Sequence, residues 1–124
     1  MPTKIRIILD GITVAGELVD TECAKAIAAV LPIETEPNEW GDEFYFKVPL
    51  TMNLDETGTI RVKAGDLGFW PPGDAVAIFF GPTPMSVGYE PVPASAVNII
   101  GMIHGDATVL RHAKGSKTIG IEKA

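Results

Sequence analysis

A β-hairpin at the start of the chain constrains the fold more than any other feature. Residues 4–18 read KIRIILDGITVAGEL, with Asp-Gly at 10–11 between two runs of alternating apolar residues. Asp-Gly tolerates the positive φ angles of a type I′ turn, and a two-residue turn fixes the register of the strands beside it. The expected cross-strand pairs are Leu9 with Ile12, Ile7 with Val14, Ile5 with Gly16 and Lys4 with Glu17. The first three pairs share an apolar face, and the fourth places opposite charges together on the other face.

Short strands and tight turns are predicted along the rest of the chain. Apolar runs predict further strands at 39–50, two within 60–70 around a Gly-Asp turn, and others at 75–80, 96–103 and 117–122. The segment GPTPMSVGYEPVPAS at 81–95 contains four prolines, so a fixed surface loop is expected there. Helices are predicted at 20–32 and 104–115, each with a capping residue at its start. Asp20 or Thr21 would cap the first helix, and Asp106 would cap the second.

Together these elements predict a mainly β fold. Eight short strands can close into a barrel, which removes the unpaired edges that short strands otherwise expose. The two helices would cap the open ends of such a barrel. A chain of 124 residues has the size of a single domain, 1–124, and can bury a core without disulfides. We therefore expect a closed eight-stranded β-barrel capped by two short α-helices.

Charge and motif content argue against several classes of function. The net charge of −6 and the scattered lysines and arginines exclude a nucleic-acid phosphate backbone as the expected partner. No phosphate-binding glycine-rich motif, CxxC pair or HExxH motif occurs, so no cofactor and no metal is expected. No apolar run reaches membrane-spanning length and no signal peptide is evident, so no membrane partner is expected. The single cysteine, Cys23, cannot form an internal disulfide, which favours a reducing, cytoplasmic location.

Aromatic and apolar residues provide the candidate site. No spacing of serine, histidine or carboxylate residues supports a catalytic constellation, and most aromatic residues are expected in the core. Trp70 is an exception, because Pro71-Pro72-Gly73 cannot extend a strand and so places Trp70 near the surface. Met85 follows Pro84 in the predicted loop, and exposed methionines suit adaptable binding surfaces. The candidate ligand-binding residues are Trp40, Tyr45, Phe46, Met52, Trp70, Phe80 and Met85.

Three stretches carry a family resemblance. They read WGDEFYF at 40–46, GDLGFWPPGDAVAIFFGPTPMS at 65–86 and PASAVNIIG at 93–101. On these stretches the chain resembles the small prokaryotic cyclophilin-like proteins, which share the cyclophilin barrel and have no settled function. The resemblance covers nearly the whole chain. It implies a closed eight-stranded barrel capped by two helices, in agreement with the elements predicted above.

The chain is also similar, more faintly, to the true cyclophilins, which are peptidyl-prolyl isomerases. The segment EFYFKVP at 43–49 is similar to the cyclophilin strand that carries a catalytic arginine. By this resemblance the catalytic arginine, glutamine and histidine are replaced by Phe46, Ile78 and Val97. The arginine is the donor that acts on the twisted amide, whose rotation barrier is about 18–20 kcal/mol. The resemblance therefore implies an apolar wall, including Met52 and Phe80, without the polar catalytic groups.

Three functions remain open from the sequence. The first is a binding module for an apolar or proline-containing peptide segment or a small hydrophobic ligand, with catalysis unproved. The second is a peptidyl-prolyl isomerase with an altered active site. The third is a structural homo-oligomer, such as a homodimer, that buries Trp70, Met85 and Tyr89. The face on which Phe46 lies bears on this choice, because a slip of one residue in the strand reverses it.

Overall fold

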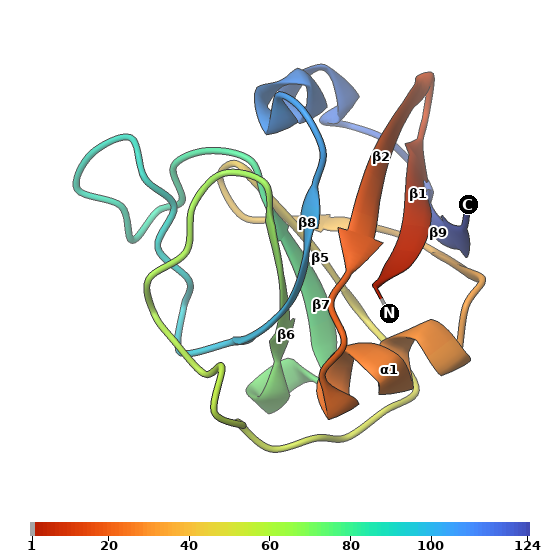
Figure 1. The fold of residues 1–124 in the computed structure, drawn as a ribbon. Helices are drawn as coiled ribbons and strands as arrows, with labels where there is room; N and C mark the ends of the chain where they lie inside the picture. Colours follow the sequence, from red (N-terminus) through yellow and green to blue (C-terminus); the bar gives the residue numbers. More distant parts are fainter. Residues whose placement is uncertain (1) are drawn as a thin grey trace.

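One curled antiparallel sheet dominates the structure (Figure 1). The computed structural model describes residues 2–124, and in that range the sheet has nine strands in the order β3-β9-β1-β2-β8-β6-β7-β5-β4. The strands are β1 Thr3–Leu9, β2 Ile12–Leu18, β3 Ile33–Thr35, β4 Asn38–Glu39, β5 Glu43–Lys47, β6 Asp66–Trp70, β7 Ala75–Phe79, β8 Asn98–Ile103 and β9 Ile119–Lys123. The predicted mainly β class is therefore confirmed.

The first hairpin forms in the predicted register. β1 pairs with β2 so that Leu9 faces Ile12 and Lys4 faces Glu17, and the two other predicted pairs lie between them. Gly11 has a φ of 76°, the positive value that the turn requires. The alternate residues of β1 that face the core are fully buried. The turn and the apolar alternation thus specify the same pairing.

The prediction of a closed eight-stranded barrel is wrong in two respects. The described strands number nine, because residues 60–63 form no strand while β3 and β4 do. The sheet is also open, since its edge strands β3 and β4 do not pair with one another within residues 2–124. These strands are consecutive in the chain, with only Glu36 and Pro37 between them. The two edges are therefore joined by the chain itself and not by backbone hydrogen bonds. Pro37, in this connection, has no backbone N–H to donate to a closing ladder.

Helical segments lie at both ends of the curled sheet, with α1 at the bottom of Figure 1 and η2 at the top. The helix α1, Glu22–Ala29, begins at Thr21, whose Oγ1 accepts a hydrogen bond from Ala24 N at 3.2 Å. The second predicted α-helix is instead a 3-10 helix, η2, Ala107–Ala113. Asp106 caps it as predicted, with Oδ1 accepting a hydrogen bond of 2.9 Å from Thr108 N. No helix within residues 2–124 is long and apolar enough to cross a membrane.

Apolar side chains pack against both faces of β7, and this arrangement positions the site. The main core, inside the curled sheet, includes Phe44, Phe46, Val76, Ile78 and Phe80. A second cluster on the opposite face consists of Val62, Ala77, Phe79 and Val97, with Tyr45, Trp70 and Ile99 packed against it. Every residue of β7 is buried, as the continuous apolar run predicts. The second cluster is thus an apolar platform on the outside of the sheet.

Candidate functional site

A cavity of about 170 Å³ lies on the outer face of the sheet, over the second apolar cluster. We call it the aromatic pocket. Its lining residues are Trp40, Glu43, Tyr45, Trp70, Ala77, Phe79, Pro93, Ala94 and Val97. The pocket is mostly apolar with a single carboxylate, and a concave apolar site with few polar groups is typical of small-ligand binding.

The alternation of β5 and β7 places the pocket residues. Glu43 and Tyr45 lie on the outer side of β5, whereas the residues between and beside them point into the main core. On the neighbouring strand, Glu43 is paired with Phe79 and Tyr45 with Ala77. Paired residues share a face of the sheet, so these four side chains meet on the floor of the pocket.

Trp70 ends β6 and forms one wall of the pocket. Directly after it, Pro71–Gly73 forms the short 3-10 helix η1, because the two prolines cannot continue the ladder. The indole Nε1 of Trp70 donates a hydrogen bond of 2.7 Å to Ser95 Oγ. This bond ties the ring to the segment that supplies Pro93 and Ala94 to the pocket. The predicted position of Trp70 near the surface is confirmed, since its side chain is only half-buried.

Glu43 is the unexpected member of the pocket. The residue is 7% exposed, and its Oε1 has no hydrogen-bond partner within the described part of the chain. Burial disfavours the charged form, so it raises the pKa of the Glu43 carboxyl from 4.5 to about 7. No lysine, arginine or histidine belongs to the described lining of the pocket. Glu43 thus stands as an uncompensated buried acid among aromatic rings.

Comparison with known proteins assigns the family. A family model described as cyclophilin-like matches residues 3–122. The chain belongs to the cyclophilin-like family. The solution structure of a hypothetical protein from Archaeoglobus fulgidus is similar to this cyclophilin-like chain, with 34% sequence identity and a TM-score of 0.81. The similarity covers 99% of this chain and 95% of that one. No curated protein sequence matches the chain.

In β5 and β7, the residues on the outer face are one position before those that the cyclophilin resemblance placed at the site. Phe46 and Ile78 are at most 1% exposed and belong to the main core. Their neighbours Tyr45 and Ala77 lie on the outer face and line the pocket. Val97 alone of the three suggested positions contributes to the pocket. The question of which face Phe46 occupies is therefore answered: it points inward.

The structure brings together three of the seven candidate ligand-binding residues. These are Trp40, Tyr45 and Trp70. Phe46 and Phe80 are buried in the main core, where the Phe80 ring packs on Phe44 at 4.9 Å between centroids. Met52 is half-buried against that core, and Met85 is exposed in the loop. The structure therefore divides the candidate set between an outer pocket, the interior and a loop.

Sequence reasoning missed Glu43 and Phe79. Glu43 is not among the candidate residues predicted from the sequence, and Phe79 falls among the aromatic residues expected in the core. A signal for Glu43 was nevertheless present, because a carboxylate between Trp40 and Tyr45 in an aromatic stretch has few polar neighbours. Placing Phe79 in the pocket requires knowing which residues of β7 face outward, and the continuous apolar run of β7 does not reveal this.

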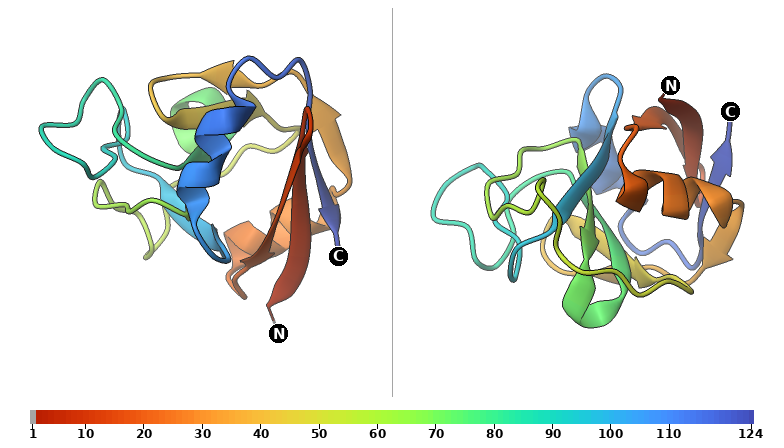
Figure 2. Two further views of the ribbon diagram at one scale, coloured as in Figure 1. Left: turned by 90° about the horizontal axis from the view of Figure 1, so that it is seen from above. Right: turned by 60° about the horizontal axis from the view of Figure 1, so that its bottom comes forward.

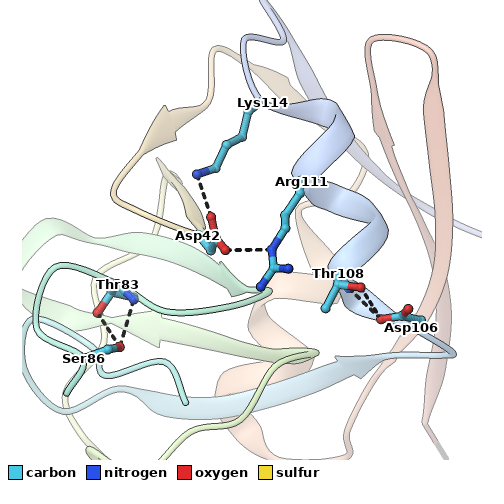
Figure 3. Close-up of polar contacts among 7 residues, drawn as sticks. All are labelled: Asp42, Thr83, Ser86, Asp106, Thr108, Arg111 and Lys114. Atoms are coloured by element: carbon cyan, nitrogen blue, oxygen red, sulfur yellow. Dashed lines mark hydrogen bonds and ion pairs between the residues drawn. The ribbon is translucent and has the colours of Figure 1, made fainter. Parts of the chain in front are cut away.

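The proline-rich loop confirms the prediction of a fixed surface loop at 81–95, since it contains no strand. It projects away from the sheet in Figures 1 and 2. Ser86 Oγ accepts from Thr83 N at 2.9 Å and donates to Glu90 O at 2.7 Å, so the loop is held by its own side chains (Figure 3). Its returning arm supplies Pro93 and Ala94 to the pocket.

A cluster of charged side chains, Asp42, Arg111 and Lys114, lies just before β5, one of the strands that carry the pocket. Asp42 Oδ2 accepts from Arg111 Nε at 2.9 Å, and Asp42 Oδ1 pairs with Lys114 Nζ at 2.6 Å (Figure 3). Burial opposes ionisation of Asp42, but the hydrogen bonds and charges of Lys114 and Arg111 together outweigh it, so the pKa of this carboxyl is lowered. The cluster anchors η2 to the turn before β5. It also commits both cations to Asp42, the residue next to Glu43.

Proposed function

We propose that this cyclophilin-like chain is a binding module that holds an apolar ligand in the aromatic pocket. The ligand would be a proline-containing peptide segment or a small hydrophobic molecule. The observation that carries the proposal is the outer cavity itself, with Trp40, Tyr45 and Trp70 around a floor built on β7. Its floor belongs to a fully buried strand, so the site is formed before ligand arrives and ordering it costs little.

Isomerase activity is the weaker candidate. Rotation of an X-Pro bond needs a positioned donor for the twisted amide as well as an apolar surface. The described pocket lining contains no arginine, and Arg111 is engaged with Asp42. A protease-coupled assay on an X-Pro peptide tests this candidate directly. We expect the rate at high protein concentration to equal the uncatalysed rate.

Tryptophan fluorescence tests ligand binding without a label. The chain has two tryptophans, Trp40 and Trp70, and both line the aromatic pocket. The intrinsic signal therefore reports on the site alone. We expect a saturable change with at least one member of a panel of proline-containing peptides and small hydrophobic compounds. An unchanged spectrum across the whole panel would contradict the proposal.

Matched variants locate the binding. Tyr45→Ala removes an aromatic ring from the pocket, whereas Tyr89→Ala removes one that is 93% exposed and outside it. We expect Tyr45→Ala to weaken binding by about ten-fold or more, since one lost aromatic contact is worth about 0.5–1.5 kcal/mol beyond its buried area. Tyr89→Ala should bind as the wild type does. Equal effects of the two variants would place the ligand elsewhere.

Exposed apolar residues in the 81–95 loop favour self-association as a further candidate. Met85, Val87 and Tyr89 are 53%, 106% and 93% exposed, and together they form an apolar tip on the projecting loop. Contiguous exposed apolar residues often mark protein interfaces. Light scattering at two protein concentrations tests a homodimer, with a Tyr89→Ser variant as the comparison. A mass that stays monomeric at both concentrations argues against this candidate.

A further inference from the structure

We propose that the aromatic pocket selects ligands bearing a methylated ammonium group, with Glu43 as the counter-ion. This inference rests on the proposed function of the same pocket and names the chemical class of its ligand. Trp40, Tyr45 and Trp70 would contact the methyl groups, and the Glu43 carboxylate would face the positive charge. Its support has three parts: an unsatisfied acid, a lack of internal partners and an aromatic surround.

The first part is the state of Glu43. Glu43 is 7% exposed, so 93% of it is buried, and its Oε1 is without a hydrogen-bond partner among residues 2–124. A buried polar group left unpaired costs about 1–3 kcal/mol, and a charged one costs more. Such a group in a native protein calls for an explanation, and a missing partner is one of the few available. Glu43 also lines the cavity, so a cationic group bound there can lie beside its carboxyl group.

The second part is that residues 2–124 supply no partner for Glu43 Oε1. One indole donor of the pocket, Trp70 Nε1, is committed to Ser95 Oγ. Arg111 and Lys114, the cations that contact the neighbouring residue Asp42, are both paired with that carboxylate. Apart from Glu43, the only titratable residue in the described pocket lining is Tyr45. A positive group that compensates the ionised carboxylate would therefore come from outside the chain.

The third part is the aromatic surround. Faces of tryptophan and tyrosine attract cations through the ring quadrupole, and cages of such rings recognise quaternary and methylated ammonium groups. A methylated ammonium carries its charge under an apolar shell, so an apolar pocket desolvates it at lower cost than a primary ammonium. The remaining wall, Ala77, Pro93 and Ala94, suits methyl groups. The net charge of −6 further favours the approach of a cation.

Choline and its neutral isostere test the inference. The isostere, 3,3-dimethyl-1-butanol, has carbon in place of the charged nitrogen and otherwise the same shape. Binding is measured by the fluorescence of Trp40 and Trp70 at pH 8, where Glu43 is ionised. We expect choline to bind at least ten-fold more tightly than the isostere. Affinity for choline should fall as the pH is lowered from 8 to 6, while affinity for the isostere should not.

Glu43→Gln identifies the residue responsible. We expect this variant to lose the preference for choline and to keep its affinity for the isostere. The matched control is Glu36→Gln, which removes the same charge from an exposed position outside the pocket. Calorimetry in two buffers of different ionisation enthalpy adds a readout, because a cation that binds ionised Glu43 releases its proton near pH 7. Glu36→Gln should keep both the preference and the proton release.

The outcomes separate this inference from the proposed function. Equal affinity for choline and the isostere, or a choline preference that survives Glu43→Gln, overturns the inference. Binding of the isostere alone also overturns it while supporting an apolar pocket. Absence of binding by both compounds overturns it as well, and the peptide panel then judges the proposed function separately.

Discussion

The indole ring of Trp70 lies directly against Gly73, such that a Cβ built at position 73 would lie 2.7 Å from both Cε3 and Cζ3 of the ring. Real side chains do not approach this closely, so only glycine at this position leaves the ring where it is. The turn after β6 therefore sets the orientation of a pocket wall. In this sense η1 helps to shape the pocket although it does not line the cavity.

Gly73→Ala should displace the Trp70 ring. The added methyl group forces the indole outward or strains the turn, and overpacking of this kind costs about 1–3 kcal/mol. We expect a red-shifted tryptophan emission and a lower midpoint of urea unfolding. Gly88→Ala is the control, because nothing lies within 4 Å of a Cβ there. Identical spectra for the two variants would show that the ring is held by other contacts.

Arginine at neighbouring positions of β5 tests which face is outside. Phe46→Arg places a charge in the main core, where Phe46 is 1% exposed, and we expect it to abolish cooperative unfolding. Tyr45→Arg places the same side chain in the pocket, and it should remain folded by circular dichroism. A stable, folded Phe46→Arg variant would contradict the inward orientation of this residue. The Tyr45→Arg variant can also be assayed for gain of isomerase activity.

Glu43 should make stability fall as the pH rises from about 4.5 to about 7. In that range the folded state keeps the proton on Glu43 while the unfolded chain has released it, so the fold loses stability with rising pH. The pKa of about 7 corresponds to about 3 kcal/mol once Glu43 is ionised above that pH. Urea unfolding should show Glu43→Gln equal to wild type at pH 4 and more stable by up to this amount at pH 8. A constant difference between the two proteins at both pH values would refute this assignment.

Asp42 should have the opposite pH dependence. Its pKa is lowered in the fold, so its contribution is present above pH 3.8, the ordinary value, and is lost as the pH falls below it. Hydrogen bonds to charged groups are worth about 1.5–3 kcal/mol, so Asp42→Asn should lose about this much at pH 7. The deficit should narrow in chemical unfolding at pH 3. Asp74→Asn serves as the comparison, since asparagine tolerates the left-handed backbone found there, and it should change little at either pH.

Local patterns predicted much of the fold because they involve neighbours in the chain. The Asp-Gly turn and its flanking alternation specify the β1–β2 register residue by residue. The continuous apolar run at 75–80 predicts the buried strand β7, and the prolines at 81–95 predict a loop. Each of these signals combines backbone preference with a buried face.

The missed features depend on contacts between distant segments. β3 and β4 are three and two residues long and exist because β9 and β5 pair with them, so their own sequence carries no strand period. Residues 60–63 carry a strand-like pattern but form no strand, and the bridge beside them joins Thr59 to Val97. Which residues of β5 face outward also depends on its pairing with a distant strand, β7. Aromatic residues occupy both faces at 44–46, so apolar alternation cannot tell the pocket from the core.

The burial of β7 on both faces has a consequence for local opening. Strands of this kind exchange their amide hydrogens only when the whole domain unfolds, whereas loops open alone. Ala77 and Phe79 support the pocket from such a strand, but Pro93 and Ala94 reach it from the projecting loop. The pocket therefore joins a strand buried on both faces to a surface loop. We expect a ligand held between them to extend the slow exchange of the strand to the returning arm of the loop.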